Sequence, residues 1–329
     1  MEDFQALFKK FQLIKVGVIG DVMLDTYMWG SVERISPEAP VPIVSLQKKE
    51  QRIGGAGNVA LNLQSLGAKA YVLSVTGDDD EAQRLNALFI DNKINIKYSV
   101  VSANRITTSK TRVICRSQQM MRLDSEITTD LTREEEQNLL DRFESFIAKE
   151  KPRIVILEDY NKGVLTEAVI RSVISISKQA GVLTAVDPKR KNFFEYEGVD
   201  LFKPNLKEVK EALNLLFTDD SPTLLQNIHS QLQHLLHHKV SFITLSDKGV
   251  FYEGNGQSEV IPSHLRNIAD VSGAGDTVIA VAALVYATTQ NIFLMAEIAN
   301  IAGGLVCEEV GTVAVDARKL LHECELLLC

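Results

Sequence analysis

Short apolar runs alternate along the chain with longer segments in which apolar residues recur every three or four positions. The apolar runs are VGVIG (16–20), YVLSV (71–75), RIVIL (153–157), LTAVD (183–187) and SFITL (241–245). The segments with helical spacing include residues 59–66, 132–149, 164–180 and 206–217. Strands that are apolar throughout and separated by helices indicate a mostly parallel sheet with helices on both faces. The pattern therefore predicts a three-layer α/β fold.

Two stretches depart from this alternation. Residues 27–47 carry three prolines and no helical period, and residues 98–123 alternate polar and apolar positions. Neither stretch is typical of a crossover helix, so we expect a small antiparallel sheet that projects from the core as a lid. The chain shows no linker, repeat or low-complexity segment, and we predict a single domain over residues 1–329 that includes this lid.

Composition and charge exclude several classes of protein. The net charge of −8 argues against the basic surface of a nucleic-acid-binding protein. The longest apolar run, residues 278–287, has about half of the ~20 residues that cross a bilayer. The N-terminus lacks the pattern of a signal peptide, and the four scattered cysteines (Cys115, Cys307, Cys324, Cys329) indicate reduced thiols. We therefore expect a cytoplasmic protein without a nucleic-acid or membrane partner.

The most specific segment for chemistry is Asp270-Val-Ser-Gly-Ala-Gly-Asp276, which leads directly into the apolar helical segment TVIAVAALVYA. Small residues allow close approach of the backbone to a ligand, and a helix start presents free N–H groups and a positive dipole end. These groups suit the charged oxygens of a phosphoryl group in transfer. Asp276 can accept a proton from an attacking hydroxyl, and we expect the helix dipole to lower its pKa. A plain helix start with Asp in its first turn is the alternative interpretation.

This string resembles the C-terminal signature of the ribokinase/PfkB carbohydrate-kinase family, and further segments resemble that family in the right order across residues 14–318. The resemblance implies a ribokinase-like fold and ATP-dependent phosphorylation of a sugar with Mg²⁺. Asp276 would be the catalytic base, and the backbone at Gly273, Ala274 and Gly275 would hold the transferring phosphoryl group. GDVMLD (20–25) and GGAGNVA (54–60) resemble the segments that contact the sugar. The implied sugar-binding residues are Asp21, Asp25, Gly54, Gly55 and Asn58.

Three further segments resemble the nucleotide side of the family. KPNLKE (203–208) is similar to the N-x-x-E element, although Asn205 as a helix cap followed by Glu208 explains these letters equally well. TLSDKG (244–249) resembles the nucleotide-binding strand and turn, and ANIAGG (299–304) resembles the helix beside the adenine. The residues implied to contact ATP are Asn205, Glu208, Ser246, Gly249, Gly273, Gly275, Asn300 and Gly303, with Asn205 and Glu208 holding Mg²⁺ through water. A monovalent cation near Asp270 is a further expectation.

A narrower resemblance concerns the acceptor. GDVMLDTY, ERISPEAPVPIV, SKTRVICRSQQMMRLD, EDYNKGVL, VDPKR and DVSGAGDT together resemble the heptose-7-phosphate kinase branch. That branch phosphorylates the anomeric hydroxyl of D-glycero-β-D-manno-heptose 7-phosphate in the synthesis of ADP-heptose, a lipopolysaccharide core precursor. Some relatives carry a fused nucleotidyltransferase with an HxGH motif. The chain contains no HxGH string, so we expect a separate protein to supply adenylyl transfer.

Several cations could hold the phosphate of such a substrate. Lys110, Arg112, Arg116 and Arg122 share one parity, so on a strand they would project from one face. Four like charges on one face repel each other unless an anion compensates them. Lys162 and Lys189 follow strand ends, where parallel-sheet enzymes bind ligands. The candidates for the phosphate are Lys110, Arg112, Arg116, Lys162 and Lys189, and a solvated strand face is the alternative interpretation of the cluster.

Three other functions stay open at this point. One is a kinase of the same family for ribose, fructose or a fructose phosphate. Another is a sugar sensor that kept the fold without turnover. The third is a dinucleotide-dependent dehydrogenase, because GGAGN followed by Asp78–Asp80 imitates a dinucleotide motif, although no apolar strand delivers the first glycine to a tight turn. In each case the uncovered lid face around Trp29, Val41, Ile43 and Val44 leads us to expect a homodimer.

Overall fold

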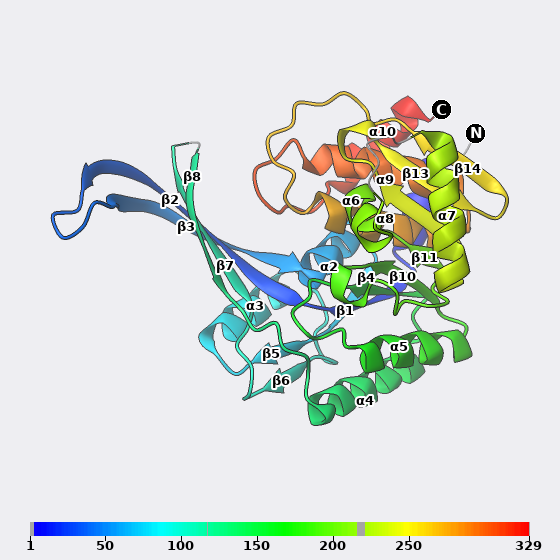
Figure 1. The fold of residues 1–329 in the computed structure, drawn as a ribbon, viewed down its shortest axis with the longest axis horizontal. Coiled ribbons are helices and arrows are strands. Elements are labelled where there is room, and N and C mark those ends of the chain that lie inside the picture. The colour runs from blue at the N-terminus through cyan, green and yellow to red at the C-terminus, as the bar shows by residue number, and fades with distance from the viewer. Residues whose placement is uncertain (1–2, 117, 216–220, 329) are drawn as a thin grey trace.

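The structure, a computed structural model, describes residues 3–116, 118–215 and 221–328, and its centre is an eight-stranded sheet (Figure 1). The strand order is β14-β13-β12-β11-β10-β9-β1-β4. All neighbours from β4 to β12 are parallel, and β13 and β14 add an antiparallel hairpin at one edge. The strands are β1 (Lys15–Gly20), β4 (Lys69–Leu73), β9 (Ile154–Glu158), β10 (Leu183–Asp187), β11 (Leu201–Phe202), β12 (Val240–Thr244), β13 (Val250–Gly254) and β14 (Gln257–Ile261).

Helices cover both faces of this sheet, so the predicted three-layer α/β fold is confirmed (Figure 1). One face packs against α4 (Arg133–Glu150), α5 (Glu167–Gln179), α6 (Leu206–Ala212) and α7 (Pro222–Leu236). The other face packs against α1 (Phe4–Phe11), α2 (Ala56–Ser65), α3 (Asp80–Asp91), α8 (Ala274–Thr289), α9 (Ile292–Val306) and α10 (Ala317–Leu327). The helix predicted over residues 206–217 ends at Ala212, and residues 216–217 lie outside the described residues.

The most buried helix is α8, in which every residue from Asp276 to Ala287 is buried. A helix that is apolar on all sides can be stable only inside the core. It lies between α2, α9 and the sheet, and its N-terminus points to the carboxyl ends of the central strands (Figure 1). This arrangement fixes the position of the segment that the sequence singled out for chemistry.

The lid is a separate four-stranded sheet that projects from the core (Figure 1). Its strands are β2 (Val22–Ile35), β3 (Pro42–Gly55), β7 (Ser109–Cys115) and β8 (Gln118–Ser125), in the order β3-β2-β7-β8. The expectation of a purely antiparallel sheet was wrong, because β2 and β7 pair in parallel. The predicted boundaries 27–47 and 98–123 also differ from the observed strands. The first part of β2 is apolar and buried, so its sequence does not distinguish it from a core strand.

One part of the second lid stretch belongs elsewhere. β6 (Val100–Ser102) pairs with β5 (Val75–Gly77) in a two-stranded sheet. Residue 117, in the same stretch, lies outside the described residues. Cys115 and Cys307 are buried free thiols, Cys324 is buried, and Cys329 lies outside the described residues. Within the described ranges, no helix has both the length and the apolar character that a bilayer crossing requires.

Candidate active site

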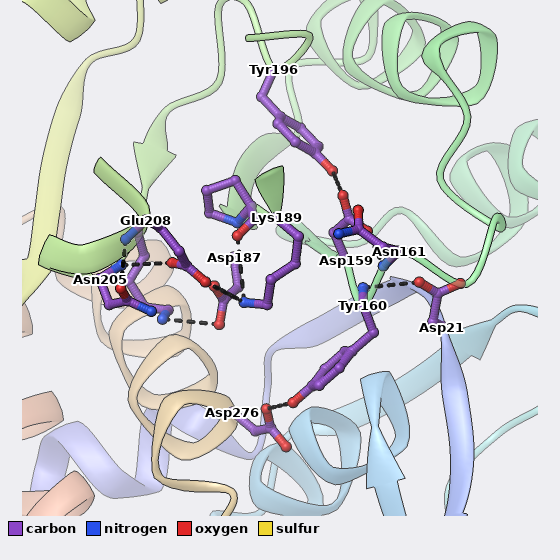
Figure 2. Close-up of polar contacts among 12 residues, drawn as sticks. Asp21, Asp159, Tyr160, Asn161, Asp187, Lys189, Tyr196, Asn205, Glu208 and Asp276 are labelled. Carbon is purple, nitrogen blue, oxygen red and sulfur yellow. Dashed lines mark hydrogen bonds and ion pairs between the residues drawn. The ribbon is translucent and has the colours of Figure 1, made fainter. Parts of the chain in front are cut away.

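The candidate active site lies where the amino terminus of α8 meets the loops that follow β9 and β10 (Figure 2). α8 begins after Gly273, whose φ of 79° lies in the left-handed region. A Cβ at this position would lie 2.7 Å from Asn58 Nδ2, so both φ and space require glycine. The Ala274 N–H donates to the Val271 carbonyl at 3.2 Å, which removes one of the predicted phosphoryl donors. The N–H groups of Gly275 and Asp276 remain at the helix start, where an α-helix has no internal acceptor for them.

Asp270 holds the loop that precedes α8. Its Oδ1 accepts hydrogen bonds from the Ser272 N–H at 3.0 Å and the Ser272 hydroxyl at 2.8 Å. Its Oδ2 accepts a hydrogen bond from the Gly311 N–H at 2.9 Å. Through these bonds Asp270 shapes the loop, and the monovalent cation expected near it stays a prediction.

Asp276 lies in the first turn of α8, with 3% of its surface exposed. Its Oδ1 accepts a hydrogen bond from the Tyr160 hydroxyl at 2.6 Å, and its Oδ2 accepts one from Asn58 Nδ2 at 2.8 Å. Burial raises the pKa of Asp276 to about 6, although the bonds from Tyr160 and Asn58 oppose this change. The expectation of a lowered pKa was wrong, because the loss of water outweighs the helix dipole. A carboxylate with a pKa near 6 accepts a proton more readily at neutral pH than an ordinary aspartate does.

Asn58, predicted to hold the sugar, orients this carboxylate. The residue is completely buried near the start of α2, and Asn62 Nδ2 donates to its carbonyl oxygen at 2.9 Å. The Asn58 amide nitrogen uses one of its two N–H groups for Asp276. A contact of Asn58 with the sugar stays a prediction.

Asp21, also predicted to hold the sugar, contacts the loop that follows β9. Its Oδ2 accepts hydrogen bonds from the backbone N–H groups of Tyr160 at 2.9 Å and Lys162 at 3.0 Å. Its Oδ1 accepts a third from the N–H of Val164 at 3.1 Å. Asp21 is 1% exposed, so these amides occupy the carboxylate and leave little of it for a sugar. Asp21 therefore positions the loop over residues 159–164 (Figure 2).

That loop supplies the main residue that the sequence did not single out. Tyr160 extends from the carboxyl end of β9 toward α8, and Figure 2 shows its hydroxyl on Asp276. Lys110 Nζ and Lys189 Nζ each lie 5.6 Å from the centre of its ring. The segment EDYNKG was noted as a family match, but no pattern in one sequence indicates which residue of such a loop reaches the base.

Glu158, at the end of β9 beside the base, is a second residue that the sequence did not single out. Glu158 is completely buried, and neither of its carboxylate oxygens has a hydrogen-bond partner among the described residues. Burial, followed by the charges of Asp187 and Asp276, raises the pKa of Glu158 well above its ordinary value. Asp187, the neighbour of Glu158 across the strands, forms ion pairs with Lys203 at 2.9 Å and Lys189 at 3.0 Å.

The predicted sugar-contacting glycines lie at the root of the lid, where β3 meets α2. A Cβ at Gly54 would lie 2.4 Å from Asp25 Oδ2, and one at Gly55 would lie 2.4 Å from the Asp21 carbonyl. Both positions therefore require glycine for close packing. Asp25 itself is 2% exposed and forms an ion pair with Arg112 at 2.5 Å. The strand that leads to these glycines, β3, is a largely exposed antiparallel lid strand and not part of a βαβ unit, in agreement with the expectation that no apolar strand delivers them.

The cationic cluster is divided by the structure. The register of the lid strands places Lys110, Arg112 and Arg122 on one face. Arg116 follows the end of β7 at a φ of 59°, so it does not share that face and the parity argument fails for it. Arg122 is exposed and bonded to Asp124 at 2.9 Å.

The other phosphate candidates differ in the partners they already have. Lys162 pairs with Glu126 at 2.7 Å, and Lys189 pairs with Glu208 at 3.0 Å as well as with Asp187. Lys110 forms no ion pair within 4.0 Å in the described part of the chain. Burial and the nearby charge of Lys162 lower the pKa of Lys110. An anion close to Lys110 would relieve both effects.

On the predicted nucleotide side, Asn205 and Glu208 form a capping box at the start of α6. Asn205 Oδ1 accepts the Glu208 N–H at 2.8 Å, and Glu208 Oε2 accepts the Asn205 N–H at 2.8 Å. The helix-cap interpretation of this segment is therefore confirmed. The other carboxylate oxygen of Glu208 pairs with Lys189. Ser246, where many members of the family have glycine, adopts a φ of 60°, and Gly249 adopts a φ of 101°.

Asn300 and Gly303 lie on α9. Asn300 Nδ2 donates to the Pro262 carbonyl at 2.9 Å and thereby holds the loop that follows β14. A Cβ at Gly303 would lie 2.6 Å from Val278 Cγ2, so this glycine permits the close packing of α9 on α8. Gly303 therefore has a packing role, and its predicted nucleotide contact stays a prediction.

Comparison with known proteins agrees with this geometry. The profile of the pfkB family carbohydrate kinases matches residues 13–318. The chain is 39% identical over 296 residues to the "Bifunctional protein HldE" of Aliarcobacter butzleri (strain RM4018), covering 90% of this chain and 61% of that protein. It is 40% identical over 306 residues to the protein of the same name from Caulobacter vibrioides, covering 92% of this chain and 62% of that protein. The chain thus spans a little under two thirds of the length of these relatives.

Solved structures share the fold at lower sequence identity. Phosphofructokinase-2 from Escherichia coli in complex with potassium superposes with a TM-score of 0.78 at 17% identity, covering 95% of this chain and 99% of that one. Ribokinase from Arabidopsis thaliana complexed with ribose and ATP superposes with a TM-score of 0.72 at 17% identity, covering 94% of this chain and 98% of that one. The predicted ribokinase-like fold is therefore confirmed.

Proposed function

The chain belongs to the pfkB family of carbohydrate kinases, and from this premise we propose that it transfers the γ-phosphoryl group of ATP to the anomeric hydroxyl of a heptose 7-phosphate. Two features support the proposal. Phosphoryl transfer requires a carboxylate and free N–H groups close to the reacting hydroxyl. Asp276 and the N–H groups of Gly275 and Asp276 provide them at the start of α8. The branch motifs of the sequence, together with HldE relatives near 40% identity, favour a heptose phosphate over other sugars.

In this mechanism Asp276 accepts the proton of the attacking hydroxyl as the bond to the γ-phosphorus forms. Asn58 fixes the orientation of the carboxylate through Oδ2 and leaves Oδ1 as the atom that receives the proton. The pKa of about 6 keeps the carboxylate ionised at neutral pH. General-base assistance of this kind contributes about 10²–10⁴-fold to the rate.

Family membership implies that the chain uses ATP with Mg²⁺. Among the residues that the structure describes, no three or more His, Cys, Asp or Glu side chains are grouped to hold a metal ion. Mg²⁺ usually keeps several waters and takes one or two carboxylates together with substrate phosphates, so the site fits an ion that arrives with the nucleotide. Glu208, predicted with Asn205 to hold the ion through water, and Asp187 would receive it, and the ion would neutralise charge on the phosphates. Lys189, between these two carboxylates, is assigned to the ATP phosphates in this proposal.

The observation that carries the phosphate part of the proposal is Lys110. It is part-buried on the lid face next to Tyr160, lies close to Lys162, and has no carboxylate of its own within 4.0 Å among the described residues. A second phosphate near the glycine loop would be repelled by ATP, so the substrate phosphate should bind toward the lid. Arg112 is less suited than we expected, because its guanidinium already pairs with Asp25.

The experiment is an assay of ADP release with heptose 7-phosphate, unphosphorylated heptose, ribose, fructose and fructose 6-phosphate. We expect heptose 7-phosphate to be preferred, and Lys110→Ala to raise its KM about ten- to a hundredfold with little effect on the free heptose, as for loss of one charge-assisted hydrogen bond. Arg116→Ala is the matched control, because Arg116 lies beyond the end of β7, and it should leave both KM values unchanged. A wild type that prefers a free sugar or fructose 6-phosphate would leave a carbohydrate kinase with another acceptor.

We further propose that the chain forms a homodimer through the lid sheets. Apolar side chains are exposed there, among them Ile35 at 60%, Leu46 at 53% and Met121 at 54%. A projecting sheet with apolar surface and open edges is covered most simply by the same sheet of a second copy. A cytoplasmic location also stays a prediction.

A further inference from the structure

Both oxygens of the base are occupied by side chains of the protein itself. Tyr160 donates its hydroxyl proton to Asp276 Oδ1 at 2.6 Å, and Asn58 donates to Oδ2 at 2.8 Å (Figure 2). An acceptor hydroxyl that gives its proton to Asp276 must lie within about 2.6–3.2 Å of one oxygen. The Tyr160 hydroxyl thus lies where the acceptor hydroxyl must lie relative to Oδ1. Like the acceptor, it donates a hydrogen bond to that oxygen. A carboxylate oxygen can accept two hydrogen bonds, but Asp276 is only 3% exposed, so the most direct access of an acceptor to Oδ1 is by displacement of this hydroxyl.

Asn58 is not suited to move, whereas Tyr160 is. Asn58 is 0% exposed inside the first turns of α2 and is bonded to Asn62. Tyr160 is only part-buried and lies in a loop in which Asn161 has a φ of 54° and Gly163 a φ of 88°. Asp21 holds the Tyr160 backbone N–H at 2.9 Å, so rotation of the side chain does not require the backbone to move (Figure 2).

The contacts of the Tyr160 ring connect this hydroxyl to the substrate. Lys110 Nζ and Lys189 Nζ each lie 5.6 Å from the ring centre. The proposed function assigns Lys110 to the substrate phosphate and Lys189 to the phosphates of ATP. Each cation would leave the ring when its phosphate arrives, which weakens the hold on Tyr160 only when substrates are present.

We propose that Tyr160 is a positioning residue that occupies the acceptor place on Asp276 and keeps water from the base until the sugar displaces it, thereby suppressing hydrolysis of ATP. The inference rests on the proposed function, since it takes Asp276 as the base of a kinase. Without this hydroxyl a water can donate to Oδ1. Its oxygen then bonds to the γ-phosphorus while the bond from that phosphorus to the bridging oxygen of ADP breaks. The water proton passes to Asp276 and from there to solvent, and the products are ADP and phosphate.

The test is the rate of ADP release without any sugar, measured for the wild type and Tyr160→Phe with saturating MgATP. We expect this rate to rise about tenfold or more in Tyr160→Phe, within the 10²–10⁴-fold that a general base provides. The double variant Tyr160→Phe/Asp276→Asn should return it to the wild-type level, because the added hydrolysis depends on Asp276. Tyr196→Phe is the matched control: its hydroxyl bonds to Asp159 at 2.7 Å in the same region and does not contact Asp276, so sugar-free hydrolysis should not change.

A second measurement needs no variant and covers the case in which Tyr160→Phe folds poorly. A heptose 7-phosphate analogue without the anomeric hydroxyl should displace Tyr160 from the wild type and raise ADP release severalfold. No rise in either experiment, with heptose 7-phosphate still phosphorylated, would refute the role of Tyr160 and leave the proposed function intact. If instead the wild type phosphorylated no sugar and Asp276→Asn behaved as the wild type, the proposed function itself would be wrong.

Discussion

The pH dependence of kcat/KM provides a direct measure of the environment of Asp276. The carboxylate is buried, and its pKa is raised from 3.8 to about 6. This change corresponds to a free-energy difference of about 3 kcal/mol against the ionised form. The charged and titratable groups that face it are Tyr160 and Glu158 from the end of β9, and Asp187 and Lys189 from the end of β10.

Because the base must be ionised to accept a proton, kcat/KM should fall as pH decreases through about 6, approximately tenfold at pH 5. Tyr160→Phe removes a hydrogen bond that stabilises the ionised carboxylate. Such a bond to a charged group is worth about 1.5–3 kcal/mol, which is about one to two pH units. The acidic limb should therefore move to higher pH in Tyr160→Phe, and stay in place in Tyr196→Phe, whose hydroxyl reaches Asp159 only.

The assay should separate and quantify ADP directly, since coupling enzymes have pH dependences of their own. kcat/KM reports the free enzyme, in which the Tyr160 bond is present. A profile that stays flat down to pH 5 would show that water reaches the carboxylate and that its burial does not control its pKa. An acidic limb near 6 that ignores Tyr160→Phe would show that the hydrogen bond does not stabilise the ionised form.

Three further predictions concern catalysis, stability and assembly. Asp276→Asn should lower kcat about 10²–10⁴-fold and leave ATP binding by calorimetry nearly unchanged, and a variant with near-normal kcat would remove Asp276 as the base. Glu158→Gln should raise the thermal midpoint more at pH 8 than at pH 5. Because the pKa of Glu158 is raised in the folded state, folded Glu158 keeps a proton that the unfolded chain releases above pH 4.5. Between these two pKa values the wild type therefore loses about 1.4 kcal/mol of folding free energy per pH unit, and the glutamine variant does not. Equal shifts of the thermal midpoint at both pH values would contradict this. Sedimentation at micromolar concentration should show a dimer that Leu46→Glu dissociates, and a fully active wild-type monomer would exclude the lid interface.

The fold was predictable because its signals are local. Each central strand is apolar throughout and is followed by a helical period, and the helix after Asp276 is apolar on all sides, which only a core position explains. The lid was predicted as a sheet with inexact boundaries. The buried root of β2, from Val22 to Tyr27, has the composition of a core strand, and parallel pairing of β2 with β7 is a long-range contact that no local pattern encodes.

The candidate site was predictable to the level of segments but not of partners. Family motifs implied ligand contacts for Asp21, Asn58 and Gly303, and in the structure these residues contact a loop, a carboxylate and a helix. Hydrogen-bond partners depend on distances between segments that lie far apart in sequence, such as the 218 positions between Asn58 and Asp276. Tyr160 and Glu158 were missed for the same reason, since their importance appears only once β9 ends beside α8.

Glu158 also explains how an acidic strand end can receive the phosphates of ATP. Glu158, Asp187 and Asp276 lie together at the end of the sheet, and three ionised carboxylates there would repel the nucleotide. Asp187 is paired with Lys189 and Lys203, which compensates one of these charges. The raised pKa of Glu158 favours its protonated form and so reduces a second charge. Asp276 forms no ion pair among the described residues, although the charge of Lys189 lowers its pKa, and it is the carboxylate that the reaction needs in ionised form.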